Sequence, residues 1–322
     1  MKKLYYEDSH LQSFTATVTG CTQVKKGWEI TLDATAFYPE GGGQASDTGI
    51  LGGVNVISVW EENEEVFHLC DKPLEVGATI EGRIDWERRF DLMQQHAGEH
   101  IVSGIIHKRY GHHNVGFHMG SDVITIDFDG PVPVEDLQEI EAAANDAIWQ
   151  DLPIKCWYPS PEELPTVPYR RKKDLAWPVR IVEFPGYDIC ACCGTHPKTT
   201  GAIGLVKLFS CIKFHEGVRI EMACGKRALN MLNAAYEQNK QVSQAFSAKI
   251  GETGAAARRM NETLAAEKFR ANTLEKQLFT QIAQGYAGKN LALHFAKDLT
   301  PNSCRELCDA IAEQAKIAVT LS

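Results

Sequence analysis

The chain has 322 residues, of which 44% are hydrophobic and 23% are charged, and its formal net charge is −9 at pH 7. This composition is typical of a folded globular protein, and at roughly 100 to 200 residues per domain the length predicts two or three domains. The sequence has no apolar run of about 18 residues and no signal-peptide core at its start, so we expect a cytoplasmic protein without membrane association. Ten unevenly spaced cysteines argue against a secreted disulfide framework and favour reduced thiols or metal binding.

Residues 1–85 are predicted to form an antiparallel β-domain, which we expect to be a barrel. The runs at 14–18 and 28–32 alternate apolar and polar residues, and turns rich in Gly, Asp and Asn separate such runs. Near Asp85, a candidate N-cap, the pattern changes to that of a helix. Apolar residues then recur every four positions, at Met93, Ala97, Ile101 and Ile105. This helix is therefore expected to bury one face.

Residues 86–225 are predicted to form an α+β domain. A second helix is indicated over 137–148, and it ends before the pair Leu152-Pro153. Strand-like runs follow at 179–182, 203–209 and 218–222. Helices mixed with strands in this way favour an α+β arrangement.

From residue 226 the pattern becomes helical, with apolar residues on heptad positions up to residue 278 and breaks at Gly251 and Gly254. We interpret 226–288 as two long helices folded into an antiparallel hairpin; the alternative is one long helix in a dimeric coiled coil, which makes a homodimer possible. Residues 289–322 predict a strand, a helix and a strand of a small α/β domain. Because the last strand ends next to the terminus and needs a neighbour, we expect this domain to be partial. The predicted fold class is thus α+β multidomain.

Two histidines and a cysteine-rich segment point to a metal site. His96 and His100 lie four positions apart on a predicted helix, so their imidazoles share one side of it. Cys192 and His196 repeat this spacing within the segment Cys-Ala-Cys-Cys-Gly-Thr-His that begins at Cys190. A histidine pair alone is more often packed or solvated than bound to metal. The second pair raises the expectation of a shared ion.

The ligand types favour zinc. Nitrogen and sulfur ligands suit Zn²⁺, whereas magnesium and calcium take mostly oxygen. Cys190 and Cys193 are alternative thiolate ligands, and their rank below Cys192 depends mainly on the family resemblance described next. The fourth coordination position is either His196 or water. This choice decides the role, because structural zinc sites are closed and catalytic ones keep a position open.

Four motifs, in order along the chain, resemble the editing domain of alanyl-tRNA synthetase and the related alanyl-tRNA editing proteins. They are the segment from Thr35 to Gly49, which contains Phe-Tyr-Pro-Glu-Gly-Gly-Gly-Gln, the pair His96 and His100, the segment 192–196, and the segments 200–204 and 217–221. The resemblance covers nearly the whole chain. One departure is Cys193, which replaces the first glycine of the family pattern Cys-Gly-Gly-Thr-His. The helices and tail resemble the start of the C-terminal domain of the longer editing proteins, but its glycine-rich segment is missing.

The resemblance implies hydrolysis of tRNA of alanine identity that carries serine or glycine by mistake, with zinc as cofactor. It implies that Thr35 and Gln44 belong to the catalytic pocket, because a hydroxyl that bonds the serine side chain is left unpaired by alanine. Gly41, Gly42 and Gly43 are expected to let the backbone approach the substrate, or only to form a turn. Residues 1–10 leave no room for an ATP-binding domain ahead of this region, so no aminoacylation is expected.

Two other functions fit parts of the sequence. The string from His96 to His100 also satisfies the inverted zinc-peptidase motif, in which Glu99 is the general base, so Glu99 is a catalytic candidate. A zinc-stapled tRNA-binding module without catalysis is the other alternative. The basic cluster Arg170, Arg171, Lys172 and Lys173 is a candidate contact for tRNA, although such runs are more often solvated surface.

Overall fold

The computed structural model describes residues 1–171 and 177–322. The chain forms two compact units, Met1–Ala234 and Ala235–Ser322. Two hydrophobic cores lie in the first unit and one in the second. The mixture of helices and sheets confirms the α+β multidomain class. Of the predicted basic cluster, Lys172 and Lys173 lie outside the described residues.

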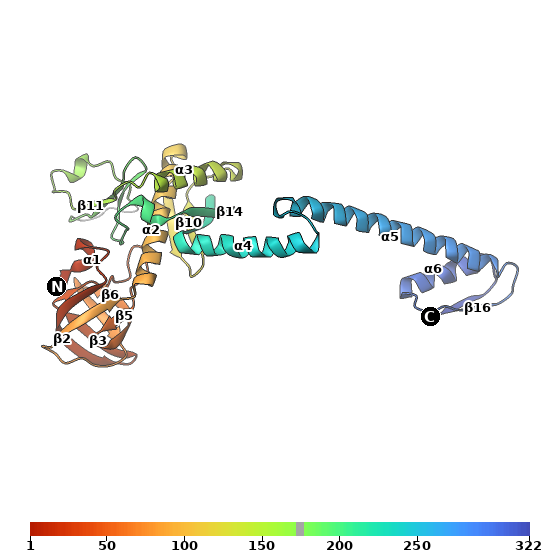
Figure 1. The fold of residues 1–322 in the computed structure, drawn as a ribbon, viewed down its shortest axis with the longest axis horizontal. Helices are drawn as coiled ribbons and strands as arrows, with labels where there is room; N and C mark the ends of the chain where they lie inside the picture. The colour runs from red at the N-terminus through yellow and green to blue at the C-terminus, as the bar shows by residue number, and fades with distance from the viewer. Residues whose placement is uncertain (172–176) are drawn as a thin grey trace. The chain divides into compact units, whose positions relative to one another are not determined.

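The N-terminal strands surround the first core (Figure 1). In the order of neighbours, the closed barrel consists of β2 (Ser13–Val24), β3 (Gly27–Leu32), β7 (Glu65–Cys70), β6 (Val54–Glu62), β5 (Gly49–Leu51) and β8 (Thr79–Ile84). Strands were predicted at 14–18 and 28–32, and both are present. Phe14, Ala16 and Val18 are buried while the residues between them face outward, because successive side chains of a strand alternate sides.

Three short elements accompany the barrel. Strand β1 (Lys2–Lys3) pairs in parallel with β4 (Ala34–Thr35), and helix α1 (Leu4–Glu7) follows β1. Tyr5 of α1 is 1% exposed and packs edge-on against Tyr38. The N-terminus is thereby anchored beside the residues that follow β4.

Helix α2 (Trp86–Tyr110) is the central element of the first unit. As predicted, the Asp85 side chain caps it by accepting a hydrogen bond from the backbone N–H of Arg88, at 3.2 Å. Met93, Ala97 and Ile101 are fully buried. Gly104 is required by close packing, since a Cβ there would lie 2.3 Å from the carbonyl oxygen of Tyr187. The helix therefore contacts neighbours on most of its surface.

Two antiparallel sheets and a helix complete this unit. The larger sheet has the order β14 (Val206–Phe214), β15 (Gly217–Cys224), β10 (Ile124–Phe128) and β9 (Asn114–Met119). The smaller has the order β11 (Lys155–Trp157), β12 (Ile181–Phe184) and β13 (Asp188–Ala191). Helix α3 (Leu137–Trp149) confirms the predicted second helix. Short 3₁₀ segments lie at η1 (Val134–Asp136), η2 (Leu164–Thr166) and η3 (Thr200–Ile203).

The strand predictions in this region were only partly right. The run at 218–222 lies in β15, and the run at 179–182 becomes β12, which begins at Ile181. The predicted strand at 203–209 begins only at Val206, because Ile203 ends η3 and Gly204 has φ 86°. A positive φ at this glycine interrupts extended backbone. Four strands were missed, namely β9, β10, β11 and β13.

Helix α4 (Gly225–Ala245) runs from the first unit into the second, which continues with η4 (Ile250–Glu252) and α5 (Thr253–Gln284). The predicted strand, helix and strand of the tail are confirmed as β16 (Ala292–Phe295), α6 (Pro301–Ala312) and β17 (Ala318–Leu321). β16 and β17 pair in parallel, so the last strand has a neighbour within the chain. The core of the second unit includes the buried residues Phe279, Leu307 and Ile311.

The two helices predicted within 226–288 are present, and their packing as an antiparallel hairpin stays a prediction. Leu229 is 48% exposed, Leu264 50% and Leu278 53%. A packed seam would bury these side chains, and such burial is what holds two antiparallel helices together. A dimeric coiled coil that covers them stays a prediction. No helix among residues 1–171 and 177–322 is long and apolar enough to cross a membrane.

Candidate active site

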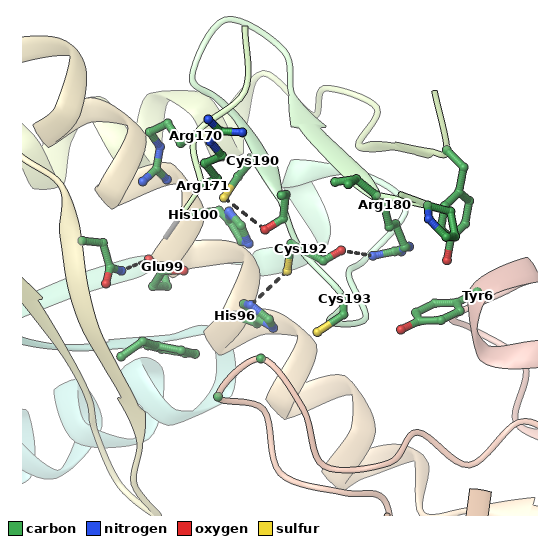
Figure 2. Close-up of a pocket in the computed structure, with 18 of the residues that line it drawn as sticks. Tyr6, His96, Glu99, His100, Arg170, Arg171, Arg180, Cys190, Cys192 and Cys193 are labelled. Carbon is green, nitrogen blue, oxygen red and sulfur yellow. Dashed lines mark hydrogen bonds between the residues drawn. The ribbon is translucent and has the colours of Figure 1, made fainter. Parts of the chain in front are cut away.

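The two predicted ligand pairs meet at one point of the first unit. Helix α2 supplies His96 and His100, and the segment after β13 supplies Cys192 and His196 (Figure 2). One ligand atom of each residue lies within 4.8 Å of all the others. The Cys192 Sγ is 3.5 Å from the Nε2 atoms of both His96 and His196. The structure thus brings together all four residues predicted to bind zinc.

Hydrogen bonds outside the cluster fix how two imidazoles face it. The Nδ1–H of His96 donates to Oε1 of Gln44 at 3.0 Å, and the Nδ1–H of His100 donates to Oδ2 of Asp188 at 2.9 Å. With Nδ1 protonated, the Nε2 lone pair of each ring is available on the cluster side. His100 Nε2 is buried without a hydrogen-bond partner among the described residues. Such an orphaned atom is expected where a metal completes the site.

Charge in the cluster favours a thiolate. Burial by itself raises the pKa of the Cys192 thiol, but the neighbouring imidazoles, His96 and His100 above all, lower it well below its ordinary value. Burial lowers the pKa of His196 to about 3, which keeps this imidazole neutral. Thiolate and neutral imidazole are the forms that bind zinc. Three nitrogen atoms and one sulfur therefore make a donor set that fits Zn²⁺.

The other two cysteines take different positions. Cys190 forms a second group with His100 and Asp188, whose candidate atoms also lie within 4.8 Å of one another. Cys193 faces the glycine-rich turn, with its Sγ 4.0 Å from the hydroxyl of Tyr38. Neither belongs to the four-residue cluster, so the geometry favours Cys192 as the thiolate ligand.

A pocket of about 550 Å³ opens beside this cluster, within the usual range of roughly 300 to 1,000 Å³ for small-molecule sites. Among the described residues that line it, four are cationic, namely Lys3, Arg170, Arg171 and Arg180. Glu99 is the one acidic side chain in that lining. The pocket is therefore suited to an anionic ligand such as the end of a nucleic acid.

Glu99 is held in the pocket by neutral donors. Its Oε1 accepts a hydrogen bond from Ser103 at 2.6 Å and another from the amide of Asn114. The residue is 5% exposed and lies between His96 and His100 on α2. A carboxylate so placed can accept a proton from a bound group.

The glycine-rich turn forms part of the pocket wall. Gly42 and Gly43 line the pocket and have φ values of 60° and 85°. A Cβ at Gly43 would lie 2.6 Å from a ring carbon of Phe117, so the turn can only approach this ring as glycine. Gly41 pairs with Gln44 to close the turn. The backbone of this turn thus reaches the pocket at Gly42 and Gly43, and its contact with substrate stays a prediction.

Thr35 and Gln44 lie behind the pocket and do not line it. Thr35 is fully buried, donates from its hydroxyl to Nε2 of His68 at 2.8 Å and accepts from the N–H of Phe37 at 3.1 Å. The Gln44 amide donates to the Thr195 hydroxyl at 2.8 Å, while its Oε1 also accepts from the N–H of Thr195 at 3.1 Å. Gln44 therefore joins the turn to the segment that carries His196.

Arg170 and Arg171 line the pocket, as their predicted contact with substrate requires. Arg170 also forms a two-pronged ion pair with Asp188, at 2.7 and 2.8 Å. Asp188 thereby connects a pocket cation to the candidate ligand His100. Asp188 was not predicted from the sequence, although a carboxylate four residues before the predicted ligand Cys192 is a signal that could have identified it.

Two family models match the chain on either side of helix α2. Residues 3–88 match the family described as tRNA synthetases class II (A), and residues 179–221 match the Threonyl and Alanyl tRNA synthetase second additional domain. The second match contains Cys192 and His196. The first contains the barrel and the glycine-rich turn.

Similar proteins include editing proteins and ligases. The alanyl-tRNA editing protein AlaX-L of Pyrococcus horikoshii is 32% identical over 243 residues, which are 72% of this chain and 60% of that protein. An alanyl-tRNA editing protein of Danio rerio is 26% identical over 332 residues, 98% of this chain and 80% of that protein. The alanine–tRNA ligase of Thermofilum pendens is 31% identical over 99% of this chain but only 37% of its own length. The chain thus spans three fifths of the archaeal editing protein and less of the ligase.

Proposed function

Because the chain belongs to the family that alanyl-tRNA editing proteins share with alanine–tRNA ligases, we propose that it hydrolyses misacylated tRNA of alanine identity in trans. The substrates are the seryl and glycyl esters of this tRNA. The convergence of His96, His100, Cys192 and His196 beside a cationic pocket is the observation that supports this most.

The proposal assigns these four residues to one zinc ion. Their three nitrogen atoms and one sulfur match its preference, and Gln44 and Asp188 orient two of the rings. Zinc bound there supplies polarisation of an ester carbonyl or activation of a water molecule. The remaining chemistry falls to residues of the chain itself.

Binding and proton transfer are assigned to the pocket residues. Lys3, Arg170, Arg171 and Arg180 attract the RNA backbone, since each phosphate carries a negative charge. Glu99 takes a proton from the attacking water and returns it to the ribose oxygen as the ester C–O bond breaks. The products are the amino acid and tRNA with a restored terminal hydroxyl group.

A non-catalytic zinc-stapled tRNA-binding module is the second candidate. The observation that favours it is the fourth ligand, because His196 lies in the cluster and four protein ligands are typical of structural zinc. Zinc would then only hold helix α2 against the segment after β13. The peptidase alternative has no support from the two matched families, which are both families of tRNA synthetase domains.

Rates of ester loss from seryl-, glycyl- and alanyl-tRNA of alanine identity, measured with bound zinc, separate the two candidates. We expect loss from the misacylated forms with the alanyl form spared, and we expect His96→Ala to lose both zinc and activity. His118→Ala is the matched control, because His118 is an exposed histidine on β9. Glu99→Gln should keep its zinc but hydrolyse the ester at least about 100-fold more slowly, which is the usual contribution of a general base to the rate.

A wild-type protein that binds zinc and tRNA but hydrolyses none of these esters would support the binding module. Full activity of Glu99→Gln would overturn only the assignment of the general base. The tRNA in these assays must be tested with and without the protein, because aminoacyl esters also hydrolyse in water.

A further inference from the structure

We propose that Tyr6, Tyr158 and Arg180 form a stacking surface for the adenine base at the 3′ end of the tRNA. The amino acid is esterified to this terminal adenosine, so the base must lie close to any ester held beside the metal cluster. This inference rests on the proposed function and adds the residues that recognise the nucleoside.

The three planar side chains come from distant segments and meet at the pocket. Tyr6 belongs to α1, Tyr158 follows β11, and Arg180 precedes β12; all three line the pocket together with His96 and Cys192. The guanidinium carbon of Arg180 lies 4.8 Å from the centre of the Tyr6 ring. The rings of Tyr6 and Tyr158 are 6.5 Å apart and nearly perpendicular, at 77°. Figure 2 shows Tyr6 and Arg180 on the same side of the pocket, with Cys193 drawn between Tyr6 and His96.

Arg180 is fixed next to the candidate metal ligands. Its Nη1 donates to the carbonyl oxygen of Cys192 at 3.0 Å and to that of Gly194 at 2.8 Å. The guanidinium plane is therefore held against the backbone that carries the thiolate. A base stacked on this surface lies beside the segment that carries Cys192, in the same pocket as the metal cluster, so its esterified ribose can face the cluster.

Tyr6 and its neighbour Tyr5 show that this surface is not simply part of the core. Tyr5 points inward and is 1% exposed against Tyr38, whereas Tyr6 lines the pocket. Tyr158 is 50% exposed, although burial of a large aromatic ring is normally favourable. An exposed aromatic ring beside an arginine, in a pocket with four cationic side chains, suits a base attached to phosphates.

The chemistry of stacking sets the expected size of the effect. Bases stack on aromatic rings and on guanidinium planes, and loss of one aromatic partner typically weakens binding on the order of 10- to 100-fold. Because stacking uses the ring face, Tyr6→Phe should retain binding and Tyr6→Ala should lose it. The phenol hydroxyl is not needed.

A fluorescent trinucleotide tests the proposal directly. The probe is the RNA sequence CCA with 2-aminopurine in place of the terminal adenine, titrated into the zinc-loaded full chain, because fluorescence of this base is quenched by stacking. We expect quenching with the wild type and with Tyr6→Phe. Affinity should fall at least about 10-fold in Tyr6→Ala and in Tyr158→Ala. Tyr236→Ala is the control, since Tyr236 is 54% exposed on α4 and does not line the pocket.

Unchanged binding in both alanine variants, or equal affinity for a trinucleotide whose last residue lacks a base, would overturn the stacking surface. Zinc content and circular dichroism identify a variant that fails to fold, and Tyr158→Ala is the safer of the two because its ring is half exposed.

The deacylation assay is run on the same proteins, so that the two hypotheses can fail separately. If the wild type hydrolyses the ester but the alanine variants at Tyr6 and Tyr158 bind the probe normally, the proposed function stands and the stacking surface is wrong. Quenching that depends on these tyrosines, without hydrolysis of any ester, removes the function and leaves the nucleoside site.

Discussion

The Nδ1 atom of His96 lies 3.0 Å from Oε1 of Gln44, and this hydrogen bond joins the glycine-rich turn of the first 85 residues to helix α2. The same amide oxygen accepts the N–H of Thr195, one residue before the candidate ligand His196. Gln44 is therefore a positioning residue for two of the four candidate ligands. Because Gln44 is fully inaccessible to solvent, water does not compete for its hydrogen bonds to His96 and Thr195.

We predict that Gln44→Leu weakens zinc binding about 10- to 100-fold, which is the usual effect of removing a hydrogen-bond partner of a metal-ligating histidine. The His96 ring loses the acceptor that fixes its Nδ1–H, so its Nε2 is no longer held toward the cluster. Competition with a chromophoric chelator measures the affinity. Gln23→Leu is the matched control, because Gln23 is an exposed glutamine on β2, and equal losses in both variants would contradict the assignment.

Thr35 is predicted to influence amino-acid selectivity from behind the pocket. Its hydroxyl holds Phe37 and His68, and the chain continues from Phe37 into the glycine-rich turn. Thr35→Val leaves two buried polar groups unpaired, at a cost of about 1–3 kcal/mol each in the free energy of unfolding. We expect unchanged zinc content, an altered ratio of seryl- to alanyl-tRNA hydrolysis, and recovery of both selectivity and stability in Thr35→Ser. Wild-type selectivity in Thr35→Val would remove Thr35 from the site.

His68 is predicted to make stability depend on pH. Burial lowers the pKa of His68 to about 4 from its ordinary 6.5, because the ring is surrounded by the core; the hydrogen bond from its Nδ1–H to the carbonyl of Ile30 raises the pKa but offsets this only in part. As the pH falls, the unfolded chain is protonated at His68 before the folded chain is. The contribution of neutral His68 to the free energy of unfolding is therefore complete above pH 6.5 and is lost as the pH falls toward 4. The expected loss is about 3 kcal/mol.

Urea unfolding of the wild type and of His68→Gln at several pH values between 4 and 7.5 measures this effect. The difference between the two proteins should shrink as the pH falls. A difference that stays constant over this range would show that His68 titrates normally. Titration of the His68 ring protons by NMR gives the same answer without a variant.

The buried pair Arg89 and Asp47 is predicted to hold α2 against the barrel. Both side chains are fully inaccessible, and the guanidinium also donates to the carbonyl oxygens of Ser9 and Ala36. Arg89→Met leaves the Asp47 carboxylate buried without its cation, which typically costs about 3–5 kcal/mol of stability. Urea denaturation measures it. The exposed pair of Lys226 and Glu87 is the control, and Lys226→Met should leave the midpoint unchanged.

Local patterns in the sequence were sufficient for the helices and for the identity of the cluster. The four-residue repeat from Met93 to Ile105 and the cap at Asp85 predicted α2, and helical geometry by itself places His96 and His100 on one side. Ligand chemistry then favoured Cys192 and His196 as partners. These inferences need only neighbours in the chain, and the structure confirms that the four residues meet.

The exposed seam of α4 and α5 shows where such patterns are insufficient. Heptad spacing identified the apolar stripe, but it does not say whether the stripe packs against the same chain or a second copy. For a related reason, the strand predicted from residue 203 begins only at Val206, because the apolar pattern does not indicate the positive φ of Gly204.

The tertiary structure alone decided which groups surround the cluster. Asp188 reaches His100 across 88 residues of sequence, and Gln44 reaches His96 across 52. It also placed Thr35 behind the pocket and Tyr6 within it. Contacts of this kind depend on how whole elements pack, whereas ligand types and helix spacing are fixed by residues that lie a few positions apart. That is why the sequence determined the chemistry of the site and the fold determined its partners.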